Sequence, residues 1–170
     1  MEGTKYTVPA GSVLVFGSNR MHNARNAGTT PCRYYVVELR GGEGPAASQQ
    51  PASLETMTSK AYPSDRIPYT GDGNKKGRRF FLAATHSGFK VEVHETNLGP
   101  GIEAHPPHQH EHEEIMVVTE GTLEANMDGI RQTVPAGSVL VFGSNKPHNV
   151  RNPGSSMAKY YVIELRGSEA

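Results

Sequence analysis

The sequence predicts an all-β protein, and three observations support that prediction. Gly and Pro account for 19 and 12 of the 170 residues, which disfavours long helices. No window of about 12 residues shows a clean helical period of apolar side chains. From residue 78 onward, short β-rich segments alternate with turns, as is typical of a sandwich or a barrel. A parallel α/β architecture is excluded because no segment could form its crossover helices.

The predicted strands are short and bounded by turn residues. The segment 89–98 shows the clearest strand pattern, because Val91 and Val93 alternate with Glu92 and His94. This alternation predicts one buried face and one face in contact with water. The predicted strands from residue 78 onward lie within 78–84, 89–98, 114–121, 122–129, 138–144 and 158–167.

An internal repeat divides the chain. Residues 7–41, the first repeat, align without a gap with residues 133–167, the second repeat, and 25 of the 35 pairs are identical. Only the second repeat is preceded by further predicted strands. We therefore expect a partial repeat over 1–41, a linker over 42–57 that is rich in small and polar residues, and a complete unit over 58–170.

Two explanations of the partial repeat remain open. The favoured one is that the chain starts at an internal methionine of a longer two-domain protein. The alternative is a natural half-domain that other strands complete. Either way, half a barrel exposes an apolar face and an unpaired strand edge, here in "SVLVF" and "YYVVEL". We therefore expect a homodimer, in which the half unit packs against a second copy or onto a complete barrel.

Charge and composition exclude several classes of partner. The 17 basic and 17 acidic residues cancel, so neither nucleic acid nor an anionic membrane is expected as a partner. A single cysteine, Cys32, rules out an intrachain disulfide. No apolar run approaches the ~18 residues that span a bilayer, and no signal peptide is visible. A cytoplasmic location is the default expectation.

The densest chemical signal is the histidine-rich segment 101–121. Alternate residues of a strand share a face, so His108 and His110 should point the same way and could bind one metal ion. Glu114 follows shortly after, which gives the 2-His-1-carboxylate pattern of non-haem iron and related sites. The second repeat places His148 at the start of another strand, and it is the expected fourth ligand.

Several neighbouring side chains are expected around the metal rather than on it. The sequence favours His112 at the rim of the site or just behind the ligands, and His105 at an exposed position. In the first repeat His22 corresponds to His148, but no counterpart of the other ligands precedes it, so we expect a vestigial site without metal. The remaining candidates, for which packing inside the barrel is the expected role, are Met116, Val118 and Tyr161.

These residues carry a resemblance to a known family. The segment 101–121 resembles the first motif of the cupin superfamily, G-x5-H-x-H-x3,4-E-x6-G. His108, His110, Glu114 and Gly121 match it as written, whereas Gly101 lies one residue too far from the first histidine.

The second cupin motif, G-x5-P-x-G-x2-H-x3-N, resembles part of the second repeat. Gly143 stands in place of the motif's proline and Asn145 in place of its second glycine, and both residue types suit a turn. The positions that correspond to the motif with its spacing kept are Gly137, Gly143, Asn145, His148 and Asn152.

The resemblance covers residues 58–167 and implies a double-stranded, jelly-roll-like β-barrel with a metal inside its mouth. It implies that His108, His110, Glu114 and His148 bind one divalent transition metal, which could be Mn, Fe, Zn, Ni or Cu. By the same resemblance, the chain looks like a bicupin that lacks the first half of its N-terminal cupin domain.

Cupins include dioxygenases, isomerases and decarboxylases, so the fold leaves the reaction open. We expect a metalloenzyme acting on a small organic molecule, with oxygenase chemistry as the first hypothesis and isomerase chemistry as another. The alternatives are a non-catalytic metal- or ligand-binding protein and a structural or storage protein.

Overall fold

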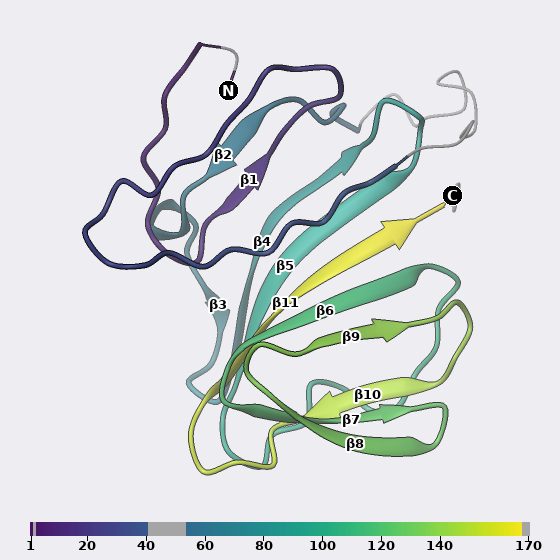
Figure 1. Cartoon of the computed structure of the whole chain (residues 1–170). Coiled ribbons are helices and arrows are strands. Elements are labelled where there is room, and N and C mark those ends of the chain that lie inside the picture. Colours follow the sequence, from purple (N-terminus) through teal and green to yellow (C-terminus); the bar gives the residue numbers. More distant parts are fainter. Residues whose placement is uncertain (2, 41–53, 168–170) are drawn as a thin grey trace.

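The computed structural model describes residues 1, 3–40 and 54–167. It confirms the predicted all-β class, because the only helix among these residues is a single 3-10 turn, Ser64–Arg66. Within the described part of the chain, no helix is long and apolar enough to cross a membrane. The strands, labelled in Figure 1, are β1 (Val13–Val15), β2 (Lys60–Tyr62), β3 (Thr70–Gly71), β4 (Lys75–Ala84), β5 (Lys90–Leu98), β6 (Glu113–Glu120), β7 (Thr122–Met127), β8 (Ile130–Pro135), β9 (Val139–Phe142), β10 (His148–Arg151) and β11 (Ala158–Arg166).

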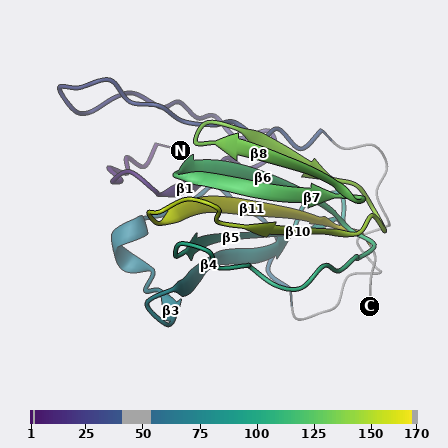
Figure 2. The ribbon, with the colours of Figure 1, turned by 90° about the horizontal axis from the view of Figure 1, so that it is seen from below.

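Two antiparallel sheets form the jelly-roll-like barrel. The larger sheet has the strand order β3-β4-β5-β11-β6-β9, and the smaller one has the order β10-β7-β8. Figures 1 and 2 show the small sheet lying across one end of the large one. Alternate side chains of the facing strands fill the space between the sheets, as a sandwich core requires. Fully buried members of this core include Leu98, Val118, Leu123, Ala125 and Ala158.

A second apolar layer covers the opposite face of the large sheet. Val91 and Val93 of β5 point to this outer face and pack in a cluster with Phe80, Val117 and Ile163. The apolar face of β5 therefore points away from the barrel interior, and its polar face points inward. The outer cluster is completed by side chains that precede β4, namely Val13, Met57, Tyr62 and Ile67.

The first repeat supplies part of that outer layer. Its "SVLVF" segment forms only the short strand β1, which pairs antiparallel with β2 and places Val13 opposite Tyr62. Hydrogen bonds then tie it to the rest of the chain: the Tyr161 hydroxyl donates to the Gly11 carbonyl at 2.7 Å, and the Ser64 hydroxyl donates to the carbonyl of residue 10 at 2.8 Å. The first repeat thus packs onto the barrel of its own chain.

The second half of the first repeat forms no strand. Residues 31–40 have no regular secondary structure, although "YYVVEL" matches the centre of β11. Tyr34 and Val36 are 71% and 68% exposed, whereas their counterparts Tyr160 and Val162 are each 3% exposed. Identical side chains therefore take opposite environments, because β11 has strands on both sides, whereas residues 34–39 pair with no strand of the described part of the chain.

The predicted linker over 42–57 lies mostly outside the described residues. Its last part is described, and it pairs with the barrel: the amide of Met57 donates to the Ala84 carbonyl at 2.7 Å, and the Ala84 amide donates to the Glu55 carbonyl at 2.9 Å. Contact with β4 therefore starts before residue 58.

Candidate metal centre

Backbone pairing brings the histidine-rich segment beside β10. The Ala104 amide donates to the Val150 carbonyl at 2.9 Å, and further along the chain His108 and His148 form an isolated antiparallel bridge. The two amides of this bridge donate to the opposite carbonyls at 3.1 and 2.8 Å. The segment 101–108 therefore runs along β10 much as another strand would, and two histidines 40 residues apart become neighbours.

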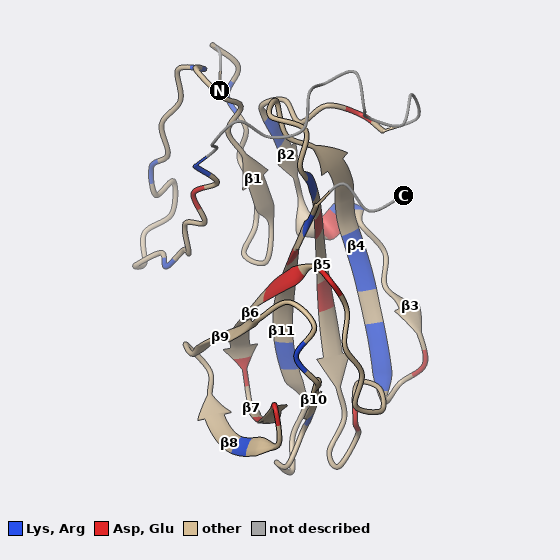
Figure 3. Cartoon of the chain, turned by 90° about the vertical axis from the view of Figure 1, so that its right-hand side faces the viewer, with Lys and Arg blue, Asp and Glu red and all other residues tan. Residues whose placement is uncertain are grey.

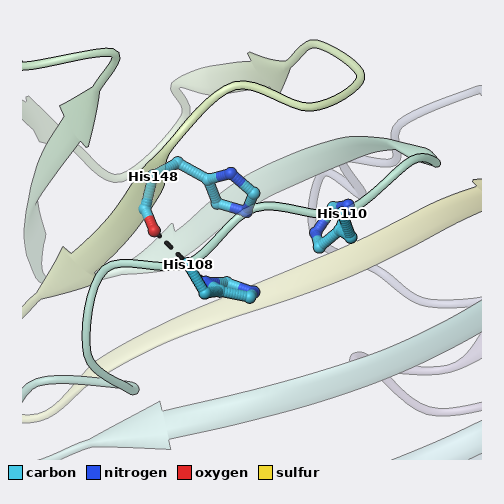
Figure 4. Close-up of side chains that lie close together, drawn as sticks. All are labelled: His108, His110 and His148. Carbon is cyan, nitrogen blue, oxygen red and sulfur yellow. Dashed lines mark hydrogen bonds between the residues drawn. The ribbon is translucent and has the colours of Figure 1, made fainter.

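The three imidazole rings share one arrangement. Nδ1 of His108 lies 3.2 Å from the His148 carbonyl, Nδ1 of His110 lies 2.8 Å from the His112 carbonyl, and Nδ1 of His148 lies 2.8 Å from the Lys146 carbonyl. A carbonyl can only accept, so in the neutral form of each ring Nδ1 carries the proton and Nε2 keeps its lone pair. One ring nitrogen from each histidine lies within 4.8 Å of the others, and Figure 4 shows the rings side by side.

Glu114 adds a carboxylate to the three histidines. It lies near the start of β6, and its Oε2 lies 3.4 Å from His110 Nε2 and 3.8 Å from His148 Nε2. Phe142 of β9 is its partner in register and stacks on the His148 ring with centroids 4.5 Å apart. The Phe142 ring therefore supports the His148 imidazole, and the strand register places Glu114 beside it.

The charges of these groups support one another. Burial alone would raise the pKa of Glu114, but His148 and His110 outweigh it and lower that pKa below its ordinary value. Burial would lower the pKa of His148, and the Glu114 carboxylate reverses the shift. Burial and the neighbouring His105 lower the pKa of His108. An ionised carboxylate beside imidazoles that keep their lone pairs is the form in which such residues bind a metal.

A divalent transition metal fits this set of donors. Nε2 of His148 is fully buried and has no hydrogen-bond partner, which is costly unless something else uses its lone pair. The carbonyl contacts to Nδ1 are the supporting interactions that metal-binding histidines usually make. Three imidazole nitrogens and one carboxylate oxygen suit Mn, Fe, Zn, Ni or Cu and do not select one of them.

His112 and His105 lie next to the candidate ligands. His112 is buried and stacks on His110 with centroids 3.6 Å apart and an interplanar angle of 3°, and its Nε2 lies 3.5 Å from Glu164 Oε2. His105 is exposed and meets His108 edge to face at 4.0 Å. Both positions agree with supporting roles around the three converging histidines.

The apolar candidates divide between the two faces of the large sheet. Met116 and Val118 are buried in the core between the sheets, on the same face of β6 as Glu114. Tyr161 was expected inside the barrel, but it lies on the outer face, where its hydroxyl reaches Gly11. Tyr160 is the tyrosine that faces inward, because successive side chains of β11 alternate between the two faces.

His22 repeats the local geometry of His148 without its surroundings. It stacks on Phe16 with centroids 4.2 Å apart, as His148 does on Phe142, and its Nδ1 lies 2.8 Å from the Arg20 carbonyl. It is exposed, and none of the histidine and acidic clusters among the described residues includes it.

A second polar cluster was missed by the sequence reasoning. Ligand-type atoms of Glu92, His94 and Glu164 all lie within 4.8 Å of one another. The sequence had placed Glu92 and His94 on a face in contact with water, but that face of β5 lines the inside of the barrel. The alternation along β5 does not say which of its two faces is covered. Val91 and Val93 are apolar because an outer layer covers them, so the polar side chains between them face the inside of the barrel.

Comparisons with known proteins agree with this architecture. Residues 94–164 match the family model Cupin_2, described as a cupin domain. No curated protein shows significant similarity to the chain. Among solved structures, an RmlC-like cupin from Shewanella frigidimarina is 16% identical with a TM-score of 0.54, and the match covers 71% of this chain and 96% of that one.

Two further structures show the same fold. A predicted oxalate decarboxylase from Thermotoga maritima is 16% identical with a TM-score of 0.52, covering 62% of this chain and 97% of that one. KdgF from Halomonas sp. is 15% identical with a TM-score of 0.53, covering 62% of this chain and 92% of that one. At these identities the likeness concerns the fold alone. Residues 94–164 thus match a cupin domain in sequence, and the barrel has the fold of these cupin structures.

Proposed function

We propose that this chain is a cupin metalloenzyme that binds one divalent transition metal through His108, His110, Glu114 and His148 and acts on a small organic molecule. The observation that supports the proposal most strongly is the shared orientation of the three histidines. Each Nδ1 contacts a backbone carbonyl, which leaves the Nε2 atoms and the Glu114 carboxylate to share one ion.

Oxygenase chemistry is the reaction class that we propose to test first. A bound redox-active ion would supply electron transfer to dioxygen, whereas a redox-inert ion would supply Lewis acidity toward a carbonyl or hydroxyl group. The chain's own residues fix the donors: the carbonyl contacts orient each imidazole, and Phe142 holds His148 by stacking. Buried Met116 and Val118 exclude water from the inner side of the site.

Metal content tests the first part of the proposal. Purified protein loaded with Fe²⁺, Mn²⁺ or Zn²⁺ and then desalted should retain about one ion per chain by elemental analysis. His108→Ala and His148→Ala should each retain far less, because a site with three donors binds much more weakly. The matched control is His22→Ala, which removes a histidine of the same local geometry and should change nothing. Full retention in His108→Ala and in His148→Ala would refute the ligand set.

Oxygen consumption separates the candidate activities. The iron-loaded protein should consume oxygen in the presence of a suitable small organic substrate, and the His148→Ala variant should not. Tight zinc binding with no turnover of any substrate would favour the alternative, a non-catalytic metal- or ligand-binding protein or a storage protein. The match to a cupin domain is compatible with all of these roles.

We also retain the proposal that residues 1–41 are a partial repeat before a complete barrel over 58–170, and that this repeat mediates a homodimer. Exposed Tyr34 and Val36 support it, as does the edge strand β9, where Val139 and Val141 are exposed. Light scattering after gel filtration should give twice the 18.4 kDa chain mass. A single monomer peak across the micromolar range would contradict the proposal.

A further inference from the structure

The second polar cluster continues the candidate metal centre across the large sheet. Glu92 of β5, Glu164 of β11 and Glu114 of β6 are partners in register, so their side chains form one row on the inner face. Neighbouring strands lie about 5 Å apart, which places Glu164 one spacing and Glu92 two spacings from Glu114. Figure 3 shows acidic bands on neighbouring strands of this sheet, beside basic bands along β4.

A ring contact also joins the cluster to the ligand set. The ring of His112 stacks on that of His110 with centroids 3.6 Å apart. The same His112 ring also contacts Glu164, because its Nε2 lies 3.5 Å from Glu164 Oε2. Glu164 is therefore one ring away from a proposed metal ligand. A molecule bound at the metal would have this row of carboxylates beside it.

Glu92 and Glu164 form an acidic wall beside the candidate metal centre, and the arginines next to this wall already pair with its carboxylates. Arg166 Nη2 lies 2.5 Å from Glu164 and 3.6 Å from Glu92, and the more exposed Arg79 lies 4.0 Å from Glu92. Both guanidinium groups thus point to protein carboxylates rather than to a ligand. His94 Nδ1 is buried without a hydrogen-bond partner, 3.6 Å from Glu92. The wall can accept hydrogen bonds, and its carboxylates repel a further anion.

We propose that Glu92 and Glu164 select the charge of the ligand at the metal. The wall favours neutral or cationic small molecules that present hydroxyl or ammonium groups, and it disfavours dicarboxylates such as oxalate. This inference rests on the proposed function, because it requires a metal held by His108, His110, Glu114 and His148. It adds the substrate class, which the fold alone leaves open.

Anion affinity at the metal tests the inference without an assay of activity. The probes are oxalate, a dianion, and imidazole, a neutral metal ligand, each titrated into the Co²⁺-loaded protein and followed by visible absorption. Glu164→Gln and Glu92→Gln should tighten oxalate binding by about 3- to 10-fold, with the larger effect at the nearer Glu164. Neither change should alter imidazole binding by more than about 2-fold.

A charge change of the opposite sign completes the test. Arg166→Gln leaves Glu164 without its arginine and Glu92 with only the more exposed Arg79, and it should weaken oxalate binding. Glu120→Gln, at the far end of β6 beside Lys159, is the matched control and should leave both probes unchanged. Circular dichroism checks the fold of each variant, and Arg166→Gln provides a readout that does not depend on the glutamate variants.

The outcomes separate this inference from the proposed function. If the protein binds no Co²⁺, the proposed function fails and this inference fails with it. If Co²⁺ binds but oxalate affinity is the same in all variants, only the charge selection is overturned. Equal changes for oxalate and imidazole would also overturn it, because they would indicate a general disturbance of the metal rather than an effect of charge.

Discussion

A buried ion pair between Arg78 and Glu95 offers a sharp test of how the outer layer is held to the barrel. The side chains are 8% and 0% exposed, and Arg78 donates to Glu95 Oε2 from Nε at 3.2 Å and from Nη2 at 2.7 Å. The Tyr69 hydroxyl and the Asn97 amide also donate to this carboxylate. Glu95 therefore has four donors around a charge that water does not reach.

The same arginine reaches the segment before β4. Its Nη1 donates to the Ser64 carbonyl at 2.5 Å and to the Ile67 carbonyl at 3.4 Å. Removing only the charge of Glu95 would leave this guanidinium buried without its counterion. Breaking a buried pair on one side costs about 3–5 kcal/mol. In a chain of this length each kcal/mol corresponds to about 2–4 °C, so Glu95→Gln should lower Tm by roughly 10 °C.

Thermal and urea denaturation followed by circular dichroism measure this loss. Replacing both partners, as Arg78→Met with Glu95→Leu, should recover much of the stability, because no charge then remains buried. Glu124→Gln is the surface control, since solvent-exposed pairs such as Glu124–Arg151 contribute little to stability. A loss of less than about 1 kcal/mol in Glu95→Gln, or a double variant as unstable as the single one, would show that the buried charge pair does not hold the outer layer in place.

The pH dependence of this pair has a defined sign. Burial would raise the pKa of Glu95, but the hydrogen bonds from Tyr69 and Arg78 outweigh it and lower the pKa below its ordinary value. The folded protein therefore holds the proton less tightly than the unfolded chain, whose value is about 4.3. The stabilisation is complete above about pH 5 and is lost as the pH falls through the folded pKa. The stability difference between wild type and Glu95→Gln should shrink over that window, and an unchanged difference would contradict the assignment.

Three further predictions follow from other contacts. Tyr161→Phe removes the hydrogen bond to Gly11 and should cost about 1 kcal/mol by thermal denaturation, whereas an unchanged Tm would show that this contact does not hold the first repeat in place. Asn152→Ala leaves the buried Leu98 carbonyl without its side-chain donor and should cost about 1–3 kcal/mol in urea unfolding; a loss below about 0.5 kcal/mol would argue against this bond. Zn²⁺ at about 1,000 times its Kd should stabilise the wild type by about 4 kcal/mol, reversibly with EDTA, and equal stabilisation of His148→Ala would exclude that residue as a ligand.

The sequence alone determined the fold class and the parts of the site that depend on near neighbours. Strand patterns and turn residues predicted an all-β chain, and the two motifs identified the histidines and Glu114. The repeats show how local this information is. Asn19 and Asn145 both take φ of 55°, and the turns around them place His22 and His148 alike against a phenylalanine ring. Equal sequences fix equal turns because the hydrogen bonds of a turn join residues only a few positions apart.

Which side chains are buried, and which candidate ligands come together, depends on tertiary contacts. Identical "YYV" segments place Tyr160 in the core and leave Tyr34 exposed, because only β11 lies between two partner strands. The alternation of β5 predicts two different faces but does not say which of them points into the barrel. A pattern of period two looks the same whichever face the rest of the chain covers. His148 gains His108 as a neighbour through backbone pairing across 40 residues, and His22 has no such partner among the described residues. Burial and convergence of side chains depend on contacts between distant segments, and those contacts exist only once the chain has folded.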